Sequence, residues 1–165
     1  MKVYIRHATV DDYESICDLL SEIDELHRDN LPNIFKKPTG PVREREYFLG
    51  LISDENVGLY IAELDRKIIG LVHAIVKDAP NIPVFVERRY ATIDSIIVKT
   101  GFQHHGIGTS LLDKIQEWST AKGATSIELN VYEFNKIAIS FYEKHGYKTF
   151  SRRMSKELER KNWVG

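Results

Sequence analysis

Residues 93–112 read Ile93-Asp-Ser-Ile-Ile-Val-Lys-Thr-Gly-Phe-Gln-His-His-Gly-Ile-Gly-Thr-Ser-Leu-Leu112, and this stretch decides the fold. Its first half holds the β-branched run Ile96–Val98, which is typical of a buried strand. After a break at Thr100-Gly101, apolar residues recur at helical spacing, at Ile107, Leu111, Ile115 and Trp118. The sequence therefore predicts a strand, a turn and a helix in direct succession.

The turn over residues 103–108 contains two glycines, Gly106 and Gly108. Without Cβ atoms there, an anion can approach the backbone, and the following helix directs its first N–H groups and its positive dipole end toward it. This pattern predicts a seat for a phosphate or pyrophosphate. No Gly-Lys-Ser/Thr closes the turn, which excludes a P-loop, and Leu111 stands where a dinucleotide-binding turn needs glycine. A tight turn without a ligand remains the alternative from this stretch alone.

A second motif follows a strand-like segment at residues 127–131. It reads Asn-x-x-Ala-x-x-Phe-Tyr-x-x-x-Gly-Tyr, formed by Asn135, Ala138, Phe141, Tyr142, Gly146 and Tyr147. Together with Gln103-x-x-Gly106-x-Gly108, it resembles the two motifs of the GNAT family of N-acetyltransferases, in the family's order and separation. The resemblance covers roughly residues 91–148, and the segments upstream fit the same fold more loosely.

The resemblance implies an α/β fold, with a mixed, mostly antiparallel sheet of six or seven strands flanked by about four helices. We expect one domain over residues 1–165, because this length is sufficient for one sizeable core. The other elements follow from local patterns. They are a strand at 2–7, a helix from a Thr9–Asp12 capping box to about His27, a loop over 28–41, a helix over about 43–53, strands at 57–64, 68–77 and within 84–98, the helix from Gly106 to Lys122-Gly123, a strand at 125–131, a helix at 135–145, a last strand at 147–154 and a charged, frayed or helical tail.

Composition excludes several classes of function. The formal net charge of −1 gives no basic field, which argues against a nucleic-acid binder. There is no long apolar run and Met1 leads directly into a strand-like segment, so we expect no signal peptide, no membrane span and a cytoplasmic location. The single cysteine, Cys17, lies on the apolar side of a helical pattern and is expected to be a structural thiol. A homodimer is an assembly that the sequence leaves open.

The family resemblance implies acetyl-CoA as cosubstrate and no metal. It implies backbone contacts of Ile96 and Val98 with the pantetheine arm. It assigns the pyrophosphate to a set of turn and helix residues, Gln103, His104, Gly106, Ile107, Gly108 and Thr109. Many relatives carry a basic residue or Arg-Gly in this turn, so His104, and less so His105, either supplements phosphate binding or is simply solvated. Asn135 is expected to cap its helix and to touch the cofactor.

Acetyl transfer from a thioester to an amine requires a neutral amine and a protonated leaving thiolate. The family places a tyrosine beside the sulfur, and Tyr142 matches it as general acid, since a phenol has a reference pKa near 10. Asp94 lies four residues before Val98, where several relatives carry a catalytic Glu, and burying a carboxylate on a central strand is costly unless it is paired or functional. Asp94 is therefore the predicted general base. Glu128 and a water chain remain alternatives. His73, on the preceding hairpin, is a further rival but is expected to be a hydrogen-bonded wall residue.

The predicted activity is transfer of an acetyl group from acetyl-CoA to a primary amine by direct attack, with a small-molecule amine as the expected acceptor. A protein N-terminus or lysine is the first alternative, and a non-catalytic regulatory module that binds acyl-CoA is the second. Relatives build the acceptor pocket from the loop between the first two helices, here residues 27–35. Leu31 and Phe35 are candidates for an apolar wall and Asp29 for contact with a cationic amine, unless they only pack the loop.

Overall fold

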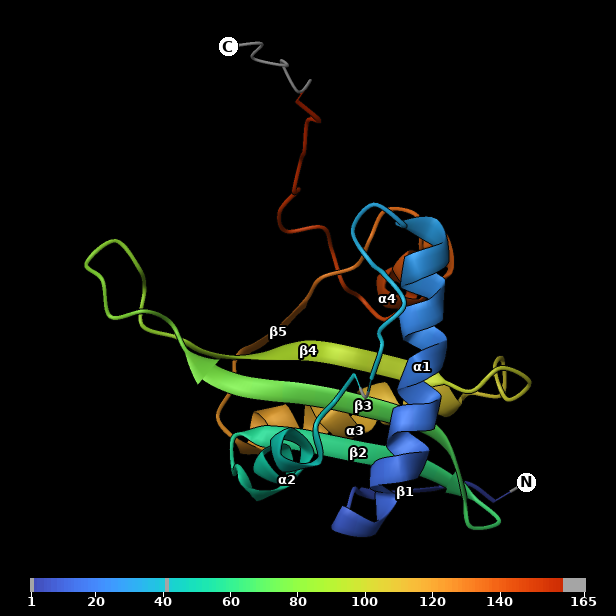
Figure 1. Ribbon diagram of the computed structural model, residues 1–165. Helices are drawn as coiled ribbons and strands as arrows, with labels where there is room; N and C mark the ends of the chain where they lie inside the picture. Colours follow the sequence, from blue (N-terminus) through green and yellow to red (C-terminus); the bar gives the residue numbers. More distant parts are fainter. Residues whose placement is uncertain (1, 41, 159–165) are drawn as a thin grey trace. The chain divides into compact units, whose positions relative to one another are not determined.

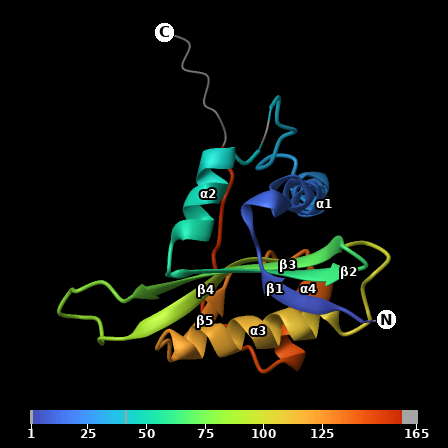
Figure 2. The same cartoon turned by 90° about the horizontal axis from the view of Figure 1, so that it is seen from below.

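The computed structural model describes residues 2–40 and 42–158 in two parts, one ending at Asn130 and one beginning at Val131. The first part contains a five-stranded sheet in the order β1-β2-β3-β4-β5. Its strands are β1 (Tyr4–His7), β2 (Val57–Leu64), β3 (Lys67–Asp78), β4 (Arg89–Val98) and β5 (Ser126–Leu129). Its helices are the 3₁₀ turn η1 (Val10–Asp12), α1 (Tyr13–Asn30), α2 (Arg45–Ser53) and α3 (Ile107–Ala121). Helices α1 and α2 cover one face of the sheet and α3 covers the other (Figures 1 and 2).

Strand pairing is antiparallel from β1 to β4, whereas β5 is parallel to β4. The ladder between β4 and β5 begins at Tyr90–Ser126 and ends at Ile93–Leu129. The remainder of β4, Asp94–Val98, therefore continues past the end of this ladder while it still pairs with β3 on its other side. The sheet is mixed and mostly antiparallel, which confirms the predicted fold class.

Helix α3 packs very closely against the sheet because two of the residues beneath it are glycines. A Cβ atom added to Gly58 would lie 2.7 Å from Cε3 of Trp118, and one added to Gly70 would lie 3.0 Å from Cδ1 of Leu111. The predicted apolar stripe of this helix is fully or nearly fully buried, at Ile107, Leu111, Ile115 and Trp118. The second core lies on the opposite face, under α1 and α2.

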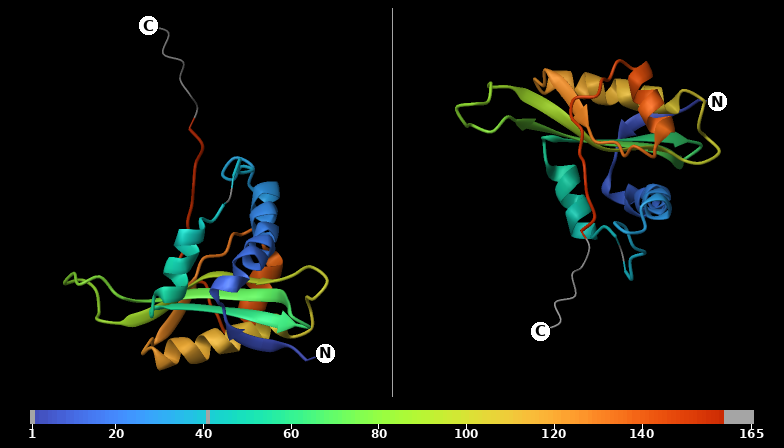
Figure 3. Two further views of the ribbon diagram at one scale, coloured as in Figure 1. Left: turned by 60° about the horizontal axis from the view of Figure 1, so that its bottom comes forward. Right: turned by 90° about the horizontal axis from the view of Figure 1, so that it is seen from above.

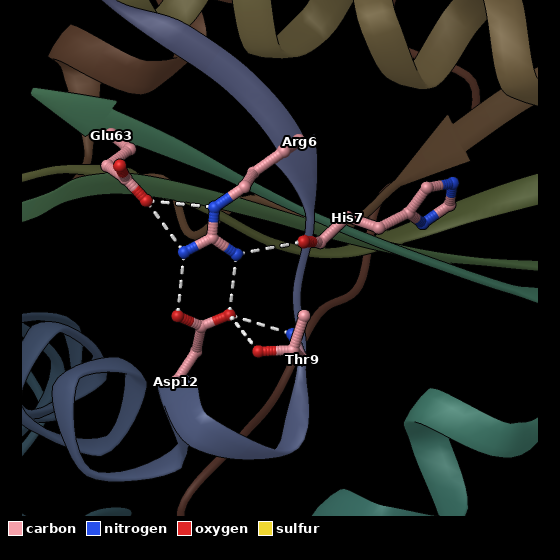
Figure 4. A network of polar contacts seen from close by, with 5 residues as sticks. All are labelled: Arg6, His7, Thr9, Asp12 and Glu63. Atoms are coloured by element: carbon pink, nitrogen blue, oxygen red, sulfur yellow. Dashed lines mark hydrogen bonds and ion pairs between the residues drawn. The ribbon is translucent and has the colours of Figure 1, made fainter. Parts of the chain in front are cut away.

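A polar network fixes the start of α1 to the sheet (Figure 4). The guanidinium of Arg6 on β1 donates to both Asp12 oxygens at 2.7 and 2.9 Å, and its Nε donates to Glu63 on β2 at 2.8 Å. Asp12 Oδ2 also accepts from the Thr9 backbone N–H at 2.7 Å, so the carboxylate reaches back as predicted for a capping box. The adjacent Arg6 guanidinium lowers the pKa of Asp12, which is only 7% exposed.

Helix α4 (Lys136–Lys144) is the regular element of the second part. Asn135 Oδ1 accepts from the Ala138 N–H at 3.1 Å, as predicted for its cap, and Gly146 ends the helix with φ of +85°. The strand predicted at 147–154 belongs to no ladder within the described residues, and Phe150 and Met154 are 85% and 86% exposed. The described sheet therefore has five strands rather than six or seven. A segment becomes a strand only where another strand pairs with it, and its own apolar pattern does not show whether such a partner exists.

The loop between β3 and β4, residues 79–88, projects away from the sheet (Figure 3). Its apolar side chains Ile82, Val84, Phe85 and Val86 are half or more exposed. None of the helices in the described residues combines the length and apolar character needed to cross a membrane.

Candidate active site

A β-bulge in β4 shapes the centre of the site. His73 on β3 pairs with Ser95 while the next residue, Ala74, pairs with Ile93, so Asp94 is one additional residue in β4. Successive side chains of a regular strand point to opposite faces. At this bulge, however, both Asp94 and Ser95 line the same cavity on the α1 face of the sheet. The bulge thus brings a carboxylate and a hydroxyl to one place.

The cavity has a volume of about 50 Å³, several times the roughly 10–15 Å³ that one water molecule requires. It lies between α1, α2 and the sheet. Its walls are mostly apolar and aromatic, from Tyr13, Ile16, Cys17, Leu20, Tyr47, Phe48, Leu51, Leu59 and Leu71, and its polar groups come from Arg43, His73, Asp94 and Ser95. A mainly apolar pocket with a few convergent polar groups is the usual form of a small-molecule site.

His73 and Asp94 form the central polar pair of this cavity. His73 Nδ1 lies 3.3 Å from Asp94 Oδ2, and the Ser95 hydroxyl donates to the same oxygen at 3.3 Å. His73 is only 5% exposed, and its Nε2 is buried with no hydrogen-bond partner within the described residues. The Asp94 side chain is 62% exposed. Contact with His73 lowers the pKa of Asp94, although burial partly opposes this, so Asp94 is a carboxylate at neutral pH.

Arg43 and Cys17 complete the α1 side of the cavity. Arg43 Nη1 donates to Asp24 on α1 at 2.8 Å, and the Tyr13 hydroxyl donates to the Arg43 carbonyl at 2.7 Å. The sequence analysis missed Arg43, because its partner is 19 residues away and no local pattern connects them. Cys17 is half-buried, and burial raises the pKa of its thiol, so it keeps its proton at neutral pH.

The turn between β4 and α3 carries the predicted anion seat. Thr100 is held by α1, since its N–H and its hydroxyl donate to Glu22 Oε2 at 3.0 and 2.9 Å. His104 and Gly106 both have positive φ, of 64° and 78°, and Gly106 caps α3. Glycine adopts this conformation without strain, whereas His104 adopts it at an energetic cost. The turn thus leads directly from the end of β4 into the first turn of α3.

The arrangement fits the pantetheine arm and pyrophosphate of acetyl-CoA. Ile96 and Val98 lie on the part of β4 beyond the β5 ladder, where a ligand amide can replace a neighbouring strand. Gln103 Nε2 donates to the Val98 carbonyl at 3.1 Å, so this side chain occupies the acceptor that a ligand amide would use. His104 is exposed and thus accessible to a phosphate. Among the described residues, no three His, Cys, Asp or Glu side chains gather as metal ligands would.

The structure brings most of the predicted site residues onto one strand–turn–helix unit. Asp94, Ile96 and Val98 lie on β4, and the predicted pyrophosphate residues follow in the turn and the first turn of α3. Asn135 and Tyr142 belong to α4 and its cap, in the second part. Burial raises the pKa of Tyr142 to about 12, and this phenol therefore remains protonated throughout the neutral range.

The remaining candidates lie elsewhere in the first part. Glu128 on β5 accepts from Arg88 Nη1 at 2.7 Å and does not line the cavity. Asp29, Leu31 and Phe35 do not line it either. Phe35 instead stacks on His27 in the last turns of α1, with ring centroids 5.3 Å apart, so this side chain packs the loop against the helix.

Comparison with known proteins identifies the family. A model of the acetyltransferase (GNAT) family matches residues 20–147, which is most of the chain. This chain belongs to the GNAT family. The match includes β4, the glycine turn and α4, so the predicted resemblance is confirmed over both motifs and well upstream of them.

Individual relatives agree with this assignment. An uncharacterized N-acetyltransferase of Methanocaldococcus jannaschii is 32% identical over 148 residues, which are 89% of this chain and 62% of that protein. This chain thus spans less than two thirds of that relative's length. A crystal structure of a tetramutant of the BH1408 protein from Bacillus halodurans has a TM-score of 0.88 at 26% identity, covering 94% of this chain and 99% of that one.

A more distant structure shares the fold alone. It is an aminoglycoside acetyltransferase from an uncultured soil metagenomic sample, solved in complex with sisomicin. Its TM-score is 0.71 at 18% identity, covering 95% of this chain and 97% of that chain.

Proposed function

We propose that this chain is an N-acetyltransferase that moves the acetyl group of acetyl-CoA to a primary amine by direct attack in a ternary complex. The observation that carries the proposal is the course of β4. This one strand lines a small cavity at Asp94 and then continues past its β5 ladder into the glycine turn that begins α3. An amine site beside Asp94 and a pyrophosphate site at the turn would lie along one rigid strand and the turn that follows it. The two substrates would then be held in a fixed relative orientation.

Residues of β4 and the turn would hold the cosubstrate. The backbone of Ile96 and Val98 would pair with amides of the pantetheine arm, and the N–H groups at the start of α3 would bind the pyrophosphate. Gln103 would release the Val98 carbonyl when the arm binds, because both compete for that acceptor. Asn135 is a further proposed contact. When bound, acetyl-CoA supplies an acetyl group activated as a thioester.

The acceptor amine would enter the cavity beside Asp94. A carboxylate at neutral pH attracts an ammonium group, while the apolar walls favour a slender hydrocarbon chain behind it. A cavity of about 50 Å³ admits the amino end of such a chain rather than a bulky ring system. We therefore favour a small aliphatic amine over a protein lysine or N-terminus as the acceptor.

Tyr142 would protonate the departing thiolate. Its phenol retains its proton at neutral pH because burial raises its pKa to about 12. For this role Tyr142 needs only a proton to donate and the position beside the sulfur that the family motif implies.

A thermal shift with CoA tests the cosubstrate site. Ligand at one hundred times its Kd stabilises the folded state by about 2.7 kcal/mol, which raises the melting temperature of a chain of this size by roughly 5–10 °C. Gly106→Val should abolish the shift, because a side chain at this position would meet the bound pyrophosphate. In the free protein a Cβ atom at Gly106 meets no atom within 4 Å.

Gly123→Val is the matched control. Gly123 ends α3 with φ of 82°, so valine there carries the same left-handed strain far from the turn. It should lower the melting temperature and keep the CoA shift. A parent protein that shows no shift with millimolar CoA would refute the proposed site.

A further inference from the structure

We infer that His73 accepts the proton of the amine during acetyl transfer and that Asp94 is the positioning residue that orients its imidazole. The inference rests on the proposed function and deepens it by assigning the proton to one atom, His73 Nε2. Three observations carry it. They are the contact of Nδ1 with the Asp94 carboxylate, the burial of the ring and the cavity that both side chains line.

The contact with Asp94 selects the tautomer. A neutral imidazole carries one N–H group and one lone pair. A carboxylate 3.3 Å from Nδ1 favours the N–H group on that nitrogen, which leaves the lone pair on Nε2. The distance is long for a hydrogen bond, as is common for catalytic contacts that tighten only when the substrate is bound.

The second nitrogen of His73 lacks a partner. Nε2 is buried and accepts no hydrogen bond from any described residue. Leaving a buried acceptor unsatisfied is energetically unfavourable, so a functional ligand group or a water is expected beside it. The cavity has room for a water or for an amino group. A base that receives its proton directly or through one water therefore fits this nitrogen.

Asp94 is less suited to this role by itself. The His73 contact lowers the pKa of its carboxyl group below the ordinary value, which makes it a weaker base. General bases are most effective when their pKa lies near the working pH, and imidazole is the side chain that comes closest. A carboxylate that stays charged serves better to stabilise the imidazolium that forms beside it.

The other titratable groups at the cavity keep their protonation states near neutrality. The Asp24 carboxylate raises the pKa of Arg43, so the guanidinium stays charged. Burial raises the pKa of both Cys17 and Tyr13, which therefore stay protonated. Tyr47, from α2, is the remaining titratable side chain of the lining.

The step balances without any further reactant. The amine nitrogen forms a bond to the thioester carbonyl carbon, and the carbon–sulfur bond breaks with its electron pair going to sulfur. The proton leaves the amine nitrogen for His73 Nε2, and the thiolate takes a proton from Tyr142 or from water. The imidazolium then returns its proton to solvent, and Tyr142, where it was the donor, regains a proton from solvent.

Three variants test the assignment, with n-butylamine and acetyl-CoA as probes and thiol release as the signal. His73→Asn retains an N–H donor near the Nδ1 position but has no basic nitrogen. It should lower kcat/KM by about 100-fold near pH 7. The loss should shrink as the pH rises toward the amine pKa of about 10.4, where free amine becomes abundant. Asp94→Asn should cost less, and the double variant should match His73→Asn, because the two residues act as one unit.

Each outcome separates this inference from the proposed function. No thiol release by the parent enzyme, with n-butylamine or any other amine, would be a failure of the proposed function. A pH profile of His73→Asn that runs parallel to the parent's, or a larger loss in Asp94→Asn, would overturn the inference while acetyl transfer stands. A retained CoA thermal shift in each variant shows that it folds.

A nitrogen NMR spectrum of the histidine rings gives a readout that needs no activity. The parent should show the Nδ1–H tautomer for His73, and Asp94→Asn should lose this preference. An Nε2–H tautomer in the parent would also overturn the inference.

Discussion

Tyr142 and His73 show how burial sets the chemistry of single side chains. Burial raises the pKa of Tyr142 to about 12, which suits a group that must arrive protonated. His73 is buried too, but a carboxylate contacts one of its nitrogens and the other has no hydrogen-bond partner in the described part of the chain. The first arrangement keeps the phenol protonated at neutral pH, and the second leaves a ring nitrogen that can accept a proton.

Replacing Tyr142 by Phe retains the ring and removes the hydroxyl proton. We expect kcat to fall by roughly 10- to 1,000-fold, in or just below the general-acid range, while the CoA thermal shift changes little. Steady-state thiol release and the thermal shift measure the two effects. Activity within about twofold of the parent would mean that water protonates the thiolate and that Tyr142 is structural.

The sequence identifies some of these residues as candidates but not others. Asp94 and Tyr142 match positions of the GNAT motifs, so the family resemblance identifies them as candidates. Arg43 and the pairing of His73 with Asp94 depend on the β4 bulge and on contacts between distant segments. No local pattern encodes these, because a bulge displaces a side chain without changing the composition around it.

Among the elements, α1 depends on a charged anchor at its start. Asp12 accepts from Arg6 and from the Thr9 N–H, and Arg6 also reaches Glu63, so one network joins β1, β2 and the first turn of the helix. Helix α1 supplies one wall of the cavity and holds Thr100 through Glu22. The anchor thus helps to position both the proposed acceptor cavity and the beginning of the proposed anion site.

Asp12→Asn should lower the free energy of unfolding by about 1.5–3 kcal/mol, because it removes hydrogen bonds to a charged group. The pKa of Asp12 is lower in the folded state than in the unfolded state. Its contribution is therefore fully present above the unfolded pKa, near 3.9, and is lost as the pH falls through the folded value. Thermal melts at several pH values should show a constant difference in melting temperature between variant and parent near neutrality. This difference should become smaller below about pH 4.

Asp11→Asn is the control for this prediction, since Asp11 is exposed on the same turn and loses the same charge. It should change the melting temperature very little. Equal effects of the two variants would mean that net charge, and not the Arg6 contact, accounts for the loss.

At the scale of the chain, local patterns predicted the elements well and long-range pairing poorly. The strand–turn–helix at 93–112 and the hairpin of β2 and β3 lie within a residue or two of their predicted bounds, because each is specified by its own periodicity and turn. Residues 147–154 have a strand-like pattern but no ladder in the described residues, since pairing depends on a partner elsewhere. The cavity could not be predicted from local patterns, because its lining comes from two helices, three strands and Arg43 in the segment before α2.

The close packing of α3 gives a stability prediction. Gly58→Ala would place a Cβ atom 2.7 Å from the Trp118 ring, and we expect this overpacking to cost about 1–3 kcal/mol. Gly50→Ala in α2 is the matched variant, because a Cβ atom there meets nothing within 4 Å. It should be neutral or stabilise by up to about 1 kcal/mol through helix propensity. Chemical denaturation measures both, and a neutral Gly58→Ala would mean that α3 is free to move away from the sheet.

The central claim is that one strand aligns acetyl-CoA with a primary amine for direct transfer. The most direct measurement is thiol release from acetyl-CoA with n-butylamine, phenethylamine and a lysine peptide, with the products identified by mass spectrometry. The account predicts amine-dependent release, an amine product carrying one added acetyl group, and no acetylated protein intermediate. Release that is independent of every amine, or an acetyl group trapped on Cys17 during turnover, would contradict it.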